Sequence, residues 1–129
     1  MPALNSIQVD KLFRLIGTPK APVIIDVRTD EDFAADPRLI PGAMRRPWAE
    51  VANWAGGFRG RPVVVACWQG HKLSQGAAAW LRQDGAEAEA LDGGVKAWVD
   101  AGYPLVPEAI LPTRDPQGRT VWVTRARPK

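Results

Sequence analysis

Two runs of β-branched residues constrain the fold of this chain more than any other feature. Residues 23–28 read VIIDVR and residues 61–67 read RPVVVAC. Continuous runs of this kind are typical of strands that are buried on both faces of a parallel sheet. A stretch that can form a helix follows each run, at residues 29–33 and 73–85. This alternation of strands and helices predicts an α/β fold with a parallel sheet.

Weaker patterns complete the predicted fold. They indicate a helix over residues 9–17 that Gly17 ends, a cap at Thr29 or Asp30, a short helix over 49–55, a short strand and turn over 88–94, and a helix over 95–102. Right-handed crossovers between parallel strands then place helices on both faces of the sheet.

The composition changes at Pro104, where a proline-rich stretch begins. Acidic and basic side chains balance over residues 1–107, so the whole net charge of +3 comes from residues 108–129. No basic face is expected on the main body, which argues against a nucleic acid partner. We therefore expect one domain over residues 1–105, and a C-terminal extension or linker over 106–129.

The sequence also excludes several classes of function. No apolar run approaches the roughly 20 residues of a membrane span, so no membrane partner is expected. The N-terminal residues show no secretory signal, and a reducing cytoplasm is the expected compartment. The single cysteine, Cys67, excludes an internal disulfide and a cysteine-based zinc cluster. The single histidine, His71, has no neighbouring ligand types, so neither a metal nor another cofactor is expected.

Cys67 stands where the second predicted strand ends and a loop leads to a helix. Parallel α/β sheets place their sites at this edge. Loop N–H groups and the helix dipole would favour a thiolate, the reactive form of cysteine, and Gly70 allows the tight turn that this needs. Lys72 and a protonated His71 would add positive charge. The position alone is equally compatible with an inert buried cysteine, and His71 is compatible with a general base or with a solvent-exposed side chain.

Four segments together resemble a rhodanese-like domain. They are VIIDVRTDEDF, LIPGA, VVVACWQGHKLSQGAAAWL and ALDGGVKAWVDAGYPL, which stand in the order that the family shows. The resemblance covers about residues 5–105 and implies a five-stranded parallel sheet flanked by helices on both faces. It also implies that Cys67 accepts sulfane sulfur from a small anionic donor, such as thiosulfate or a persulfide, and passes it to a thiol or to cyanide.

The resemblance assigns the remaining site residues. Residues expected to bind substrate are Trp68, Gln69, Gly70, His71, Lys72 and Leu73. Asp26 and Arg28 match the family's D-V-R segment and are expected to be mainly structural. Arg45 and Arg46 follow the Ile-Pro-Gly-Ala segment and would guide anions to the site, and Ser74 is expected to support the loop.

This chain departs from the family pattern in three places. Leu39 replaces a histidine that many members carry before Ile-Pro-Gly-Ala, at a position outside the chemistry. Lys72 and Leu73 replace the arginine and serine of the common sulfurtransferase loop, and lysine lacks the planar fork of arginine. Ser74 lies one residue further from Cys67 than is usual, which suggests a loop longer by one residue.

A longer loop resembles the rhodanese-fold phosphatases and arsenate reductases, which carry an arginine where Leu73 stands. Loss of that bidentate clamp should weaken the binding of phosphate or arsenate. Handling of arsenate, chromate or phosphate esters is therefore an alternative function, and a non-catalytic sensing or docking module is a further one. The C-terminal WVTRARPK, residues 122–129, is similar to the start of the domain that follows rhodanese-like modules in bacterial chromate-resistance proteins. It suggests a downstream domain or partner protein.

Overall fold

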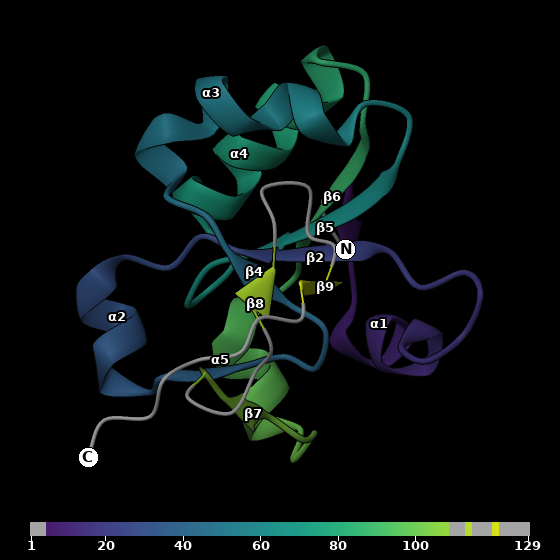
Figure 1. Ribbon diagram of the computed structural model, residues 1–129. Helices are drawn as coiled ribbons and strands as arrows, with labels where there is room; N and C mark the ends of the chain where they lie inside the picture. Colours follow the sequence, from purple (N-terminus) through teal and green to yellow (C-terminus); the bar gives the residue numbers. More distant parts are fainter. Residues whose placement is uncertain (1–4, 109–112, 115–119, 122–129) are drawn as a thin grey trace.

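The computed structural model describes residues 5–108, 113–114 and 120–121. Its main sheet has five strands, all paired in parallel, in the order β1-β6-β5-β2-β4 (Figure 1). The strands are β1 (Ser6–Ile7), β2 (Val23–Asp26), β4 (Met44–Arg45), β5 (Pro62–Ala66) and β6 (Glu87–Leu91). The predicted fold class, a five-stranded parallel α/β sheet, is confirmed.

Helices cover both faces of this sheet, as the sequence predicts. Figure 1 shows α3 (Val51–Trp54) and α4 (Lys72–Gln83) on one face, and α1 (Val9–Leu15), α2 (Asp30–Ala35) and α5 (Gly94–Asp100) on the other. Thr29 caps α2, since its side chain accepts a hydrogen bond from the backbone N–H of Asp32 at 3.1 Å. None of the helices in the described part of the chain is long and apolar enough to cross a membrane.

Successive strand residues build one apolar core on each face, because side chains alternate along a strand. Ile25 and Val65 pack with residues of α4, whereas Ile24 and Val64 pack with residues of α1, α2 and α5. We call the first the α4-side core and the second the α5-side core. Cys67 belongs to the α4-side core.

Short elements differ from the prediction. The helix expected over residues 49–55 is a 3-10 turn η1 (Trp48–Glu50), α3 and a second 3-10 turn η2 (Ala55–Phe58), because two glycines at 56–57 weaken a regular helix there. The sequence does not reveal β1 and β4, since two residues are too few to show a periodicity.

Short strands also occur after residue 105. A short strand β7 (Val106–Pro107) pairs antiparallel with β3 (Arg38–Leu39), and the N–H of Glu108 donates to the carbonyl of Pro37 at 3.1 Å. Further along, β8 (Thr113–Arg114) pairs antiparallel with β9 (Thr120–Val121). The segment 122–129, on which the chromate-resistance resemblance rests, lies outside the described residues.

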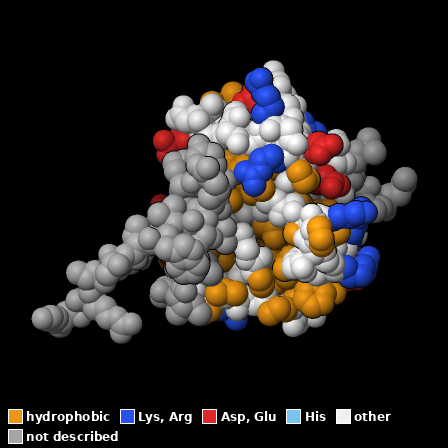
Figure 2. Space-filling view, turned by 45° about the vertical axis from the view of Figure 1, so that its right-hand side comes forward, with side chains coloured by type: hydrophobic (Ala, Val, Ile, Leu, Met, Phe, Trp, Pro, Cys, Tyr) orange, Lys and Arg blue, Asp and Glu red, His pale blue; other side chains and the backbone are white. Residues whose placement is uncertain are grey.

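An aromatic cluster joins α1 to the segment after α5. Phe13 and Tyr103 stack with ring centroids 4.2 Å apart, and the Trp98 indole donates to the carbonyl of Pro104 at 2.8 Å. The Tyr103 hydroxyl donates to Asp10 at 2.5 Å, and this bond raises the pKa of Tyr103. Figure 2 brings the α1 side of the molecule forward and shows apolar side chains gathered on the lower part of that face.

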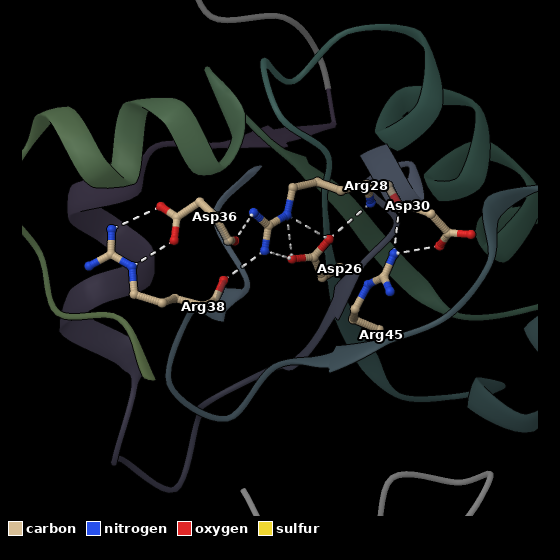
Figure 3. Close-up of polar contacts among 6 residues, drawn as sticks. All are labelled: Asp26, Arg28, Asp30, Asp36, Arg38 and Arg45. Atoms are coloured by element: carbon tan, nitrogen blue, oxygen red, sulfur yellow. Dashed lines mark hydrogen bonds and ion pairs between the residues drawn. The ribbon is translucent and has the colours of Figure 1, made fainter. Parts of the chain in front are cut away.

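A buried ion pair fixes the chain where β2 ends (Figure 3). Asp26 and Arg28 are each 2% exposed, and the Nη2 of Arg28 lies 2.7 Å from Asp26 Oδ2. The other donors of this guanidinium reach the carbonyls of Asp36 at 2.9 Å and Arg38 at 2.7 Å. Arg28 therefore connects β2 to the segment that contains β3, which agrees with a structural role for both residues of the pair.

Removing the Asp26 charge should leave the Arg28 guanidinium buried without its counterion. We expect Asp26→Asn to lower the free energy of unfolding by about 3 kcal/mol, as measured by urea titration. Asp36→Asn is the matched control, because the Asp36–Arg38 pair lies at the surface and its loss should cost less than about 1 kcal/mol. Equal effects of the two substitutions would contradict this assignment.

Candidate functional site

Cys67 lies directly after β5, at the carboxyl edge of the sheet, and only 5% of its surface is exposed. Its Sγ donates a hydrogen bond to the Oγ of Ser74 at 3.2 Å. Ser74 is fully buried in the first turn of α4. The sulfur of Cys67 therefore sits against the N-terminal end of this helix.

The carbonyl groups of Cys67 and Trp68 accept hydrogen bonds from the side of the loop opposite to the Cys67 sulfur. Val95 N–H donates to the carbonyl of Cys67, and Lys96 N–H donates to the carbonyl of Trp68, each at 2.9 Å. Both donors belong to α5, on the opposite face of the sheet from α4. Because the C=O and N–H of a trans peptide point in opposite directions, the N–H groups of Trp68 and Gln69 point away from α5. They are directed toward the side on which Sγ lies.

The N–H groups of this loop have no acceptor within the described residues. From Trp68 to Ser74, seven consecutive backbone N–H groups donate to no carbonyl and no side chain there. The last three belong to the first turn of α4, where helix geometry leaves such groups unpaired. A run of N–H donors beside a helix N-terminus stabilises negative charge. The loop is thus suited to a thiolate, a persulfide anion or a bound oxyanion.

Two glycines allow the loop to approach α5 closely. Gly70 has φ +76°, and a Cβ added there would lie 2.7 Å from the carbonyl oxygen of Leu91. Gly94 has φ +66°, and its added Cβ would lie 2.5 Å from the carbonyl oxygen of Trp68 and 2.6 Å from the nitrogen of Gly70. Both positions therefore exclude a side chain, which explains the glycine at each of them.

The predicted loop residues occupy different surroundings. Gln69, His71 and Lys72 are exposed, and Gly70 is buried. Trp68 packs against the α5-side core, and Leu73 packs against the α4-side core. The sequence interpretation expected both Trp68 and Leu73 to bind substrate, and this stays a prediction.

Arg45 lies one strand beyond Asp26 and is held by several contacts. Its guanidinium carbon lies 4.1 Å from the centroid of the Phe33 ring. Its Nη2 donates to the carbonyl of Arg28 at 3.1 Å and to the carboxylate of Asp30 at 3.2 Å. Figure 3 shows this arrangement beside the buried ion pair. A cleft of about 430 Å³ opens next to it, lined by residues 28–30 and 45–49.

Asp36, whose backbone carbonyl accepts a hydrogen bond from Arg28, has a pKa that neighbouring arginines shift. The hydrogen bond from the Arg38 side chain lowers the pKa of Asp36, and the positive charges of Arg38 and Arg28 add to this effect. No group of three His, Cys, Asp or Glu side chains that is suited to a metal ion occurs in the ranges that the structure describes.

Two features of the site were missed by the sequence interpretation. Gly93 and Gly94 read as a turn signal, although Gly94 abuts the Cys67 loop. Trp48 was not among the predicted site residues, although it lines the cleft and is 46% exposed. The Asp-Gly-Gly at residues 92–94, which follows a predicted strand, was the available signal for the first feature, and the sequence holds none for the second.

The chain matches known proteins over most of its length. The sequence profile of the rhodanese-like domain matches residues 8–101. A rhodanese-related protein from Thermoplasma volcanium is 28% identical over 81% of this chain and 99% of its own, with a TM-score of 0.69. A rhodanese-like domain protein from Staphylococcus aureus is 29% identical over 74% of this chain and 91% of its own, with a TM-score of 0.64. A thiosulfate sulfurtransferase from Pseudomonas aeruginosa shares the fold, with 23% identity over 92% of this chain and 22% of its own and a TM-score of 0.68.

Proposed function

This chain belongs to the rhodanese-like domain family, and we propose that it is a sulfurtransferase that carries sulfane sulfur as a persulfide on Cys67. The observation that supports this most strongly is the run of N–H groups from Trp68 to Ser74, which find no acceptor in the described part of the chain and lie beside a cysteine at a helix N-terminus. A persulfide anion formed there gains hydrogen bonds that an uncharged thiol does not need. Since the reaction requires reduced Cys67, we place the protein in a reducing compartment such as the cytoplasm.

The first half-reaction loads Cys67. Its thiolate attacks the outer sulfur of thiosulfate, and the bond between the two thiosulfate sulfurs breaks. Sulfite leaves with the bonding electron pair, and Cys67 keeps the transferred sulfur as a persulfide anion. Charge is conserved, because a thiolate and a dianion give a persulfide anion and a dianion. The exposed Lys72 stands at the loop and offers positive charge to the incoming donor.

The second half-reaction unloads the sulfur. A nucleophile, either cyanide or a thiolate, attacks the terminal sulfur of the persulfide, and the sulfur–sulfur bond breaks toward Cys67. Thiocyanate or a new persulfide leaves, and the Cys67 thiolate is restored. The N–H groups stabilise the charge on whichever sulfur carries it, so one cradle serves both half-reactions.

The direct test of this function is thiocyanate formation from thiosulfate and cyanide, with a thiol persulfide as a second donor. We expect the wild-type protein to form thiocyanate with at least one of these donors. An absence of turnover above the rate without protein, with both donors, would contradict the proposal.

Ser74 should assist the reaction through its hydroxyl, which is within hydrogen-bond distance of the Cys67 sulfur. A hydrogen bond to a charged group contributes about 1.5–3 kcal/mol, so we expect Ser74→Ala to lower thiocyanate formation roughly tenfold to a hundredfold. Thr18→Ala, which removes an exposed hydroxyl in the loop between α1 and β2, is the matched control and should retain the wild-type rate. A Ser74→Ala rate equal to that of the control would show that this hydroxyl plays no part.

The loop length is the observation that favours oxyanion handling as a second candidate. Ser74, not Leu73, faces the Cys67 sulfur, so residues 68–73 all lie between them. A wider loop suits a tetrahedral anion, but the Leu73 side chain packs into the α4-side core and supplies no cationic clamp. This candidate would be supported if the protein hydrolysed p-nitrophenyl phosphate, or if bound arsenate protected Cys67 from an alkylating reagent. A non-catalytic docking module would show neither reaction and no sulfur transfer.

A further inference from the structure

The cleft beside Arg45 is formed by two segments that follow neighbouring strands. Residues 28–30 come after β2, and residues 45–49 run from the end of β4 into η1. Together they enclose about 430 Å³. None of the described residues that line this cleft belongs to the Cys67 loop or to α4. The cleft is therefore a cavity separate from the cysteine, and a ligand in it need not take part in sulfur transfer.

The guanidinium of Arg45 is held in one orientation at the wall of this cleft (Figure 3). Its carbon lies 4.1 Å from the centroid of the buried Phe33 ring. Its Nη2 donates to the backbone carbonyl of Arg28 at 3.1 Å. These contacts fix the guanidinium before any ligand arrives, so a ligand that binds to it loses little affinity to the ordering of this side chain.

Most of the hydrogen-bond donors of Arg45 have no acceptor among the residues that the structure describes. A guanidinium carries N–H donors on Nε, Nη1 and Nη2, and here only Nη2 donates. Nε is buried without a partner, and Nη1 donates to no described residue. A carboxylate that binds the end of a guanidinium accepts from Nη1 and Nη2 together. The side chain of Arg45 is 27% exposed, so a ligand in the cleft can reach this end.

Asp30 occupies this end of the Arg45 guanidinium only in part. Its Oδ1 lies 3.2 Å from Nη2, and its side chain is 99% exposed. Ion pairs in such full contact with water are weak and are screened by salt. A carboxylate that contacts Nη1 and Nη2 at once has the stronger geometry. A ligand can therefore displace Asp30, which acts as a competitor for the same cation.

The rest of the cleft offers apolar surface. Pro47, Ala49 and the half-exposed indole of Trp48 line it. We propose that the cleft binds an organic carboxylate with an apolar body. The carboxylate accepts hydrogen bonds from Nη1 and Nη2 of Arg45 in place of Asp30, and the apolar body lies against Trp48. A volume of about 430 Å³ lies in the range of sites for small organic molecules and far exceeds the size of an inorganic anion.

The test compares hydrocinnamate with hydrocinnamamide, which has the same apolar body and no charge. Binding is followed by the NMR signal of the Trp48 indole N–H, which is assigned by its loss in Trp48→Phe. We expect the wild-type protein to bind the carboxylate about tenfold more tightly than the amide, because hydrogen bonds to a charged group are lost with the amide. Equal affinities for the two compounds would overturn the proposal.

Asp30→Asn tests the competition directly, since this exposed substitution leaves the Arg45 side chain intact. It should tighten the binding of hydrocinnamate about threefold and leave that of the amide unchanged. Asp100→Asn is the matched control, because it makes the same change of charge in an exposed pair with Lys96 on α5, and its affinity should equal that of wild type. Equal affinities of the Asp30→Asn and Asp100→Asn proteins for hydrocinnamate would also overturn the proposal.

Arg45→Lys tests the contact at both terminal nitrogens. Lysine keeps the charge but lacks the planar pair of donors, so we expect this variant to bind hydrocinnamate about tenfold more weakly than the wild type. An unchanged affinity in the folded variant would contradict the bidentate contact. None of these measurements requires sulfur transfer, so they are independent of the function proposed for Cys67.

Discussion

Cys67→Ser protein is expected to form thiocyanate no faster than a solution without protein. Cys67 is the only cysteine of the chain, so no other thiol can carry the persulfide. Serine is close to cysteine in size and can keep the hydrogen bond with Ser74, so we expect the Cys67→Ser protein to fold as the wild type does. The measurement is the initial rate of thiocyanate formation with thiosulfate and with a thiol persulfide as donors.

The single cysteine also provides a chemical control. Alkylation of the wild-type protein modifies only Cys67 and should remove activity in proportion to the fraction of protein modified. The melting temperature of Cys67→Ser must stay near that of wild type, so that lost activity reports on chemistry and not on unfolding. Appreciable turnover by the folded Cys67→Ser protein would exclude Cys67 as the sulfur carrier.

Gly94→Ala should destabilise the protein most among the single substitutions considered. A Cβ at this position would overlap the carbonyl oxygens of Cys67 and Trp68, which are backbone atoms that α5 holds in place. The residue also has φ +66°, a conformation that costs a non-glycine residue about 1–3 kcal/mol. Overpacking typically adds about 1–3 kcal/mol, so we expect a loss of roughly 4 kcal/mol in the free energy of unfolding.

The matched control is Gly76→Ala, because Gly76 lies inside α4 with open space around its Cα. Alanine is the better helix former, and this change should stabilise the protein by up to about 1 kcal/mol. Chemical denaturation of both variants measures the contrast. If Gly94→Ala had the same unfolding midpoint in denaturant as the wild type, this would contradict the close contact between α5 and the Cys67 loop.

Long, strongly patterned segments made most of the fold predictable. The runs that became β2 and β5 read as strands buried on both faces, and Ile24 and Ile25 do pack into opposite cores. Residue type and position limited the cap of α2 to Thr29 or Asp30, and the structure shows that it is Thr29. The two-residue strand β4 has no such pattern. Its place in the sheet depends on backbone pairing with β2, which no local sequence signal encodes.

The site was predictable where backbone geometry decides it, and less so where side-chain packing does. The position of Cys67 after a strand and before a helix was readable, and so was the displaced Ser74, which the structure places beside the sulfur. The packing of Trp68 and Leu73 could not be predicted, because it depends on the space that helices distant in sequence leave beside the loop. For the same reason the cleft beside Arg45 emerges only when β2 and β4 are paired.

The most direct test of the account is the intact mass of the wild-type protein after incubation with thiosulfate or with a thiol persulfide. We predict a gain of one sulfur atom, its absence in Cys67→Ser, and its removal on addition of cyanide. A wild-type mass that stays unchanged with both donors would contradict the claim that Cys67 carries sulfane sulfur.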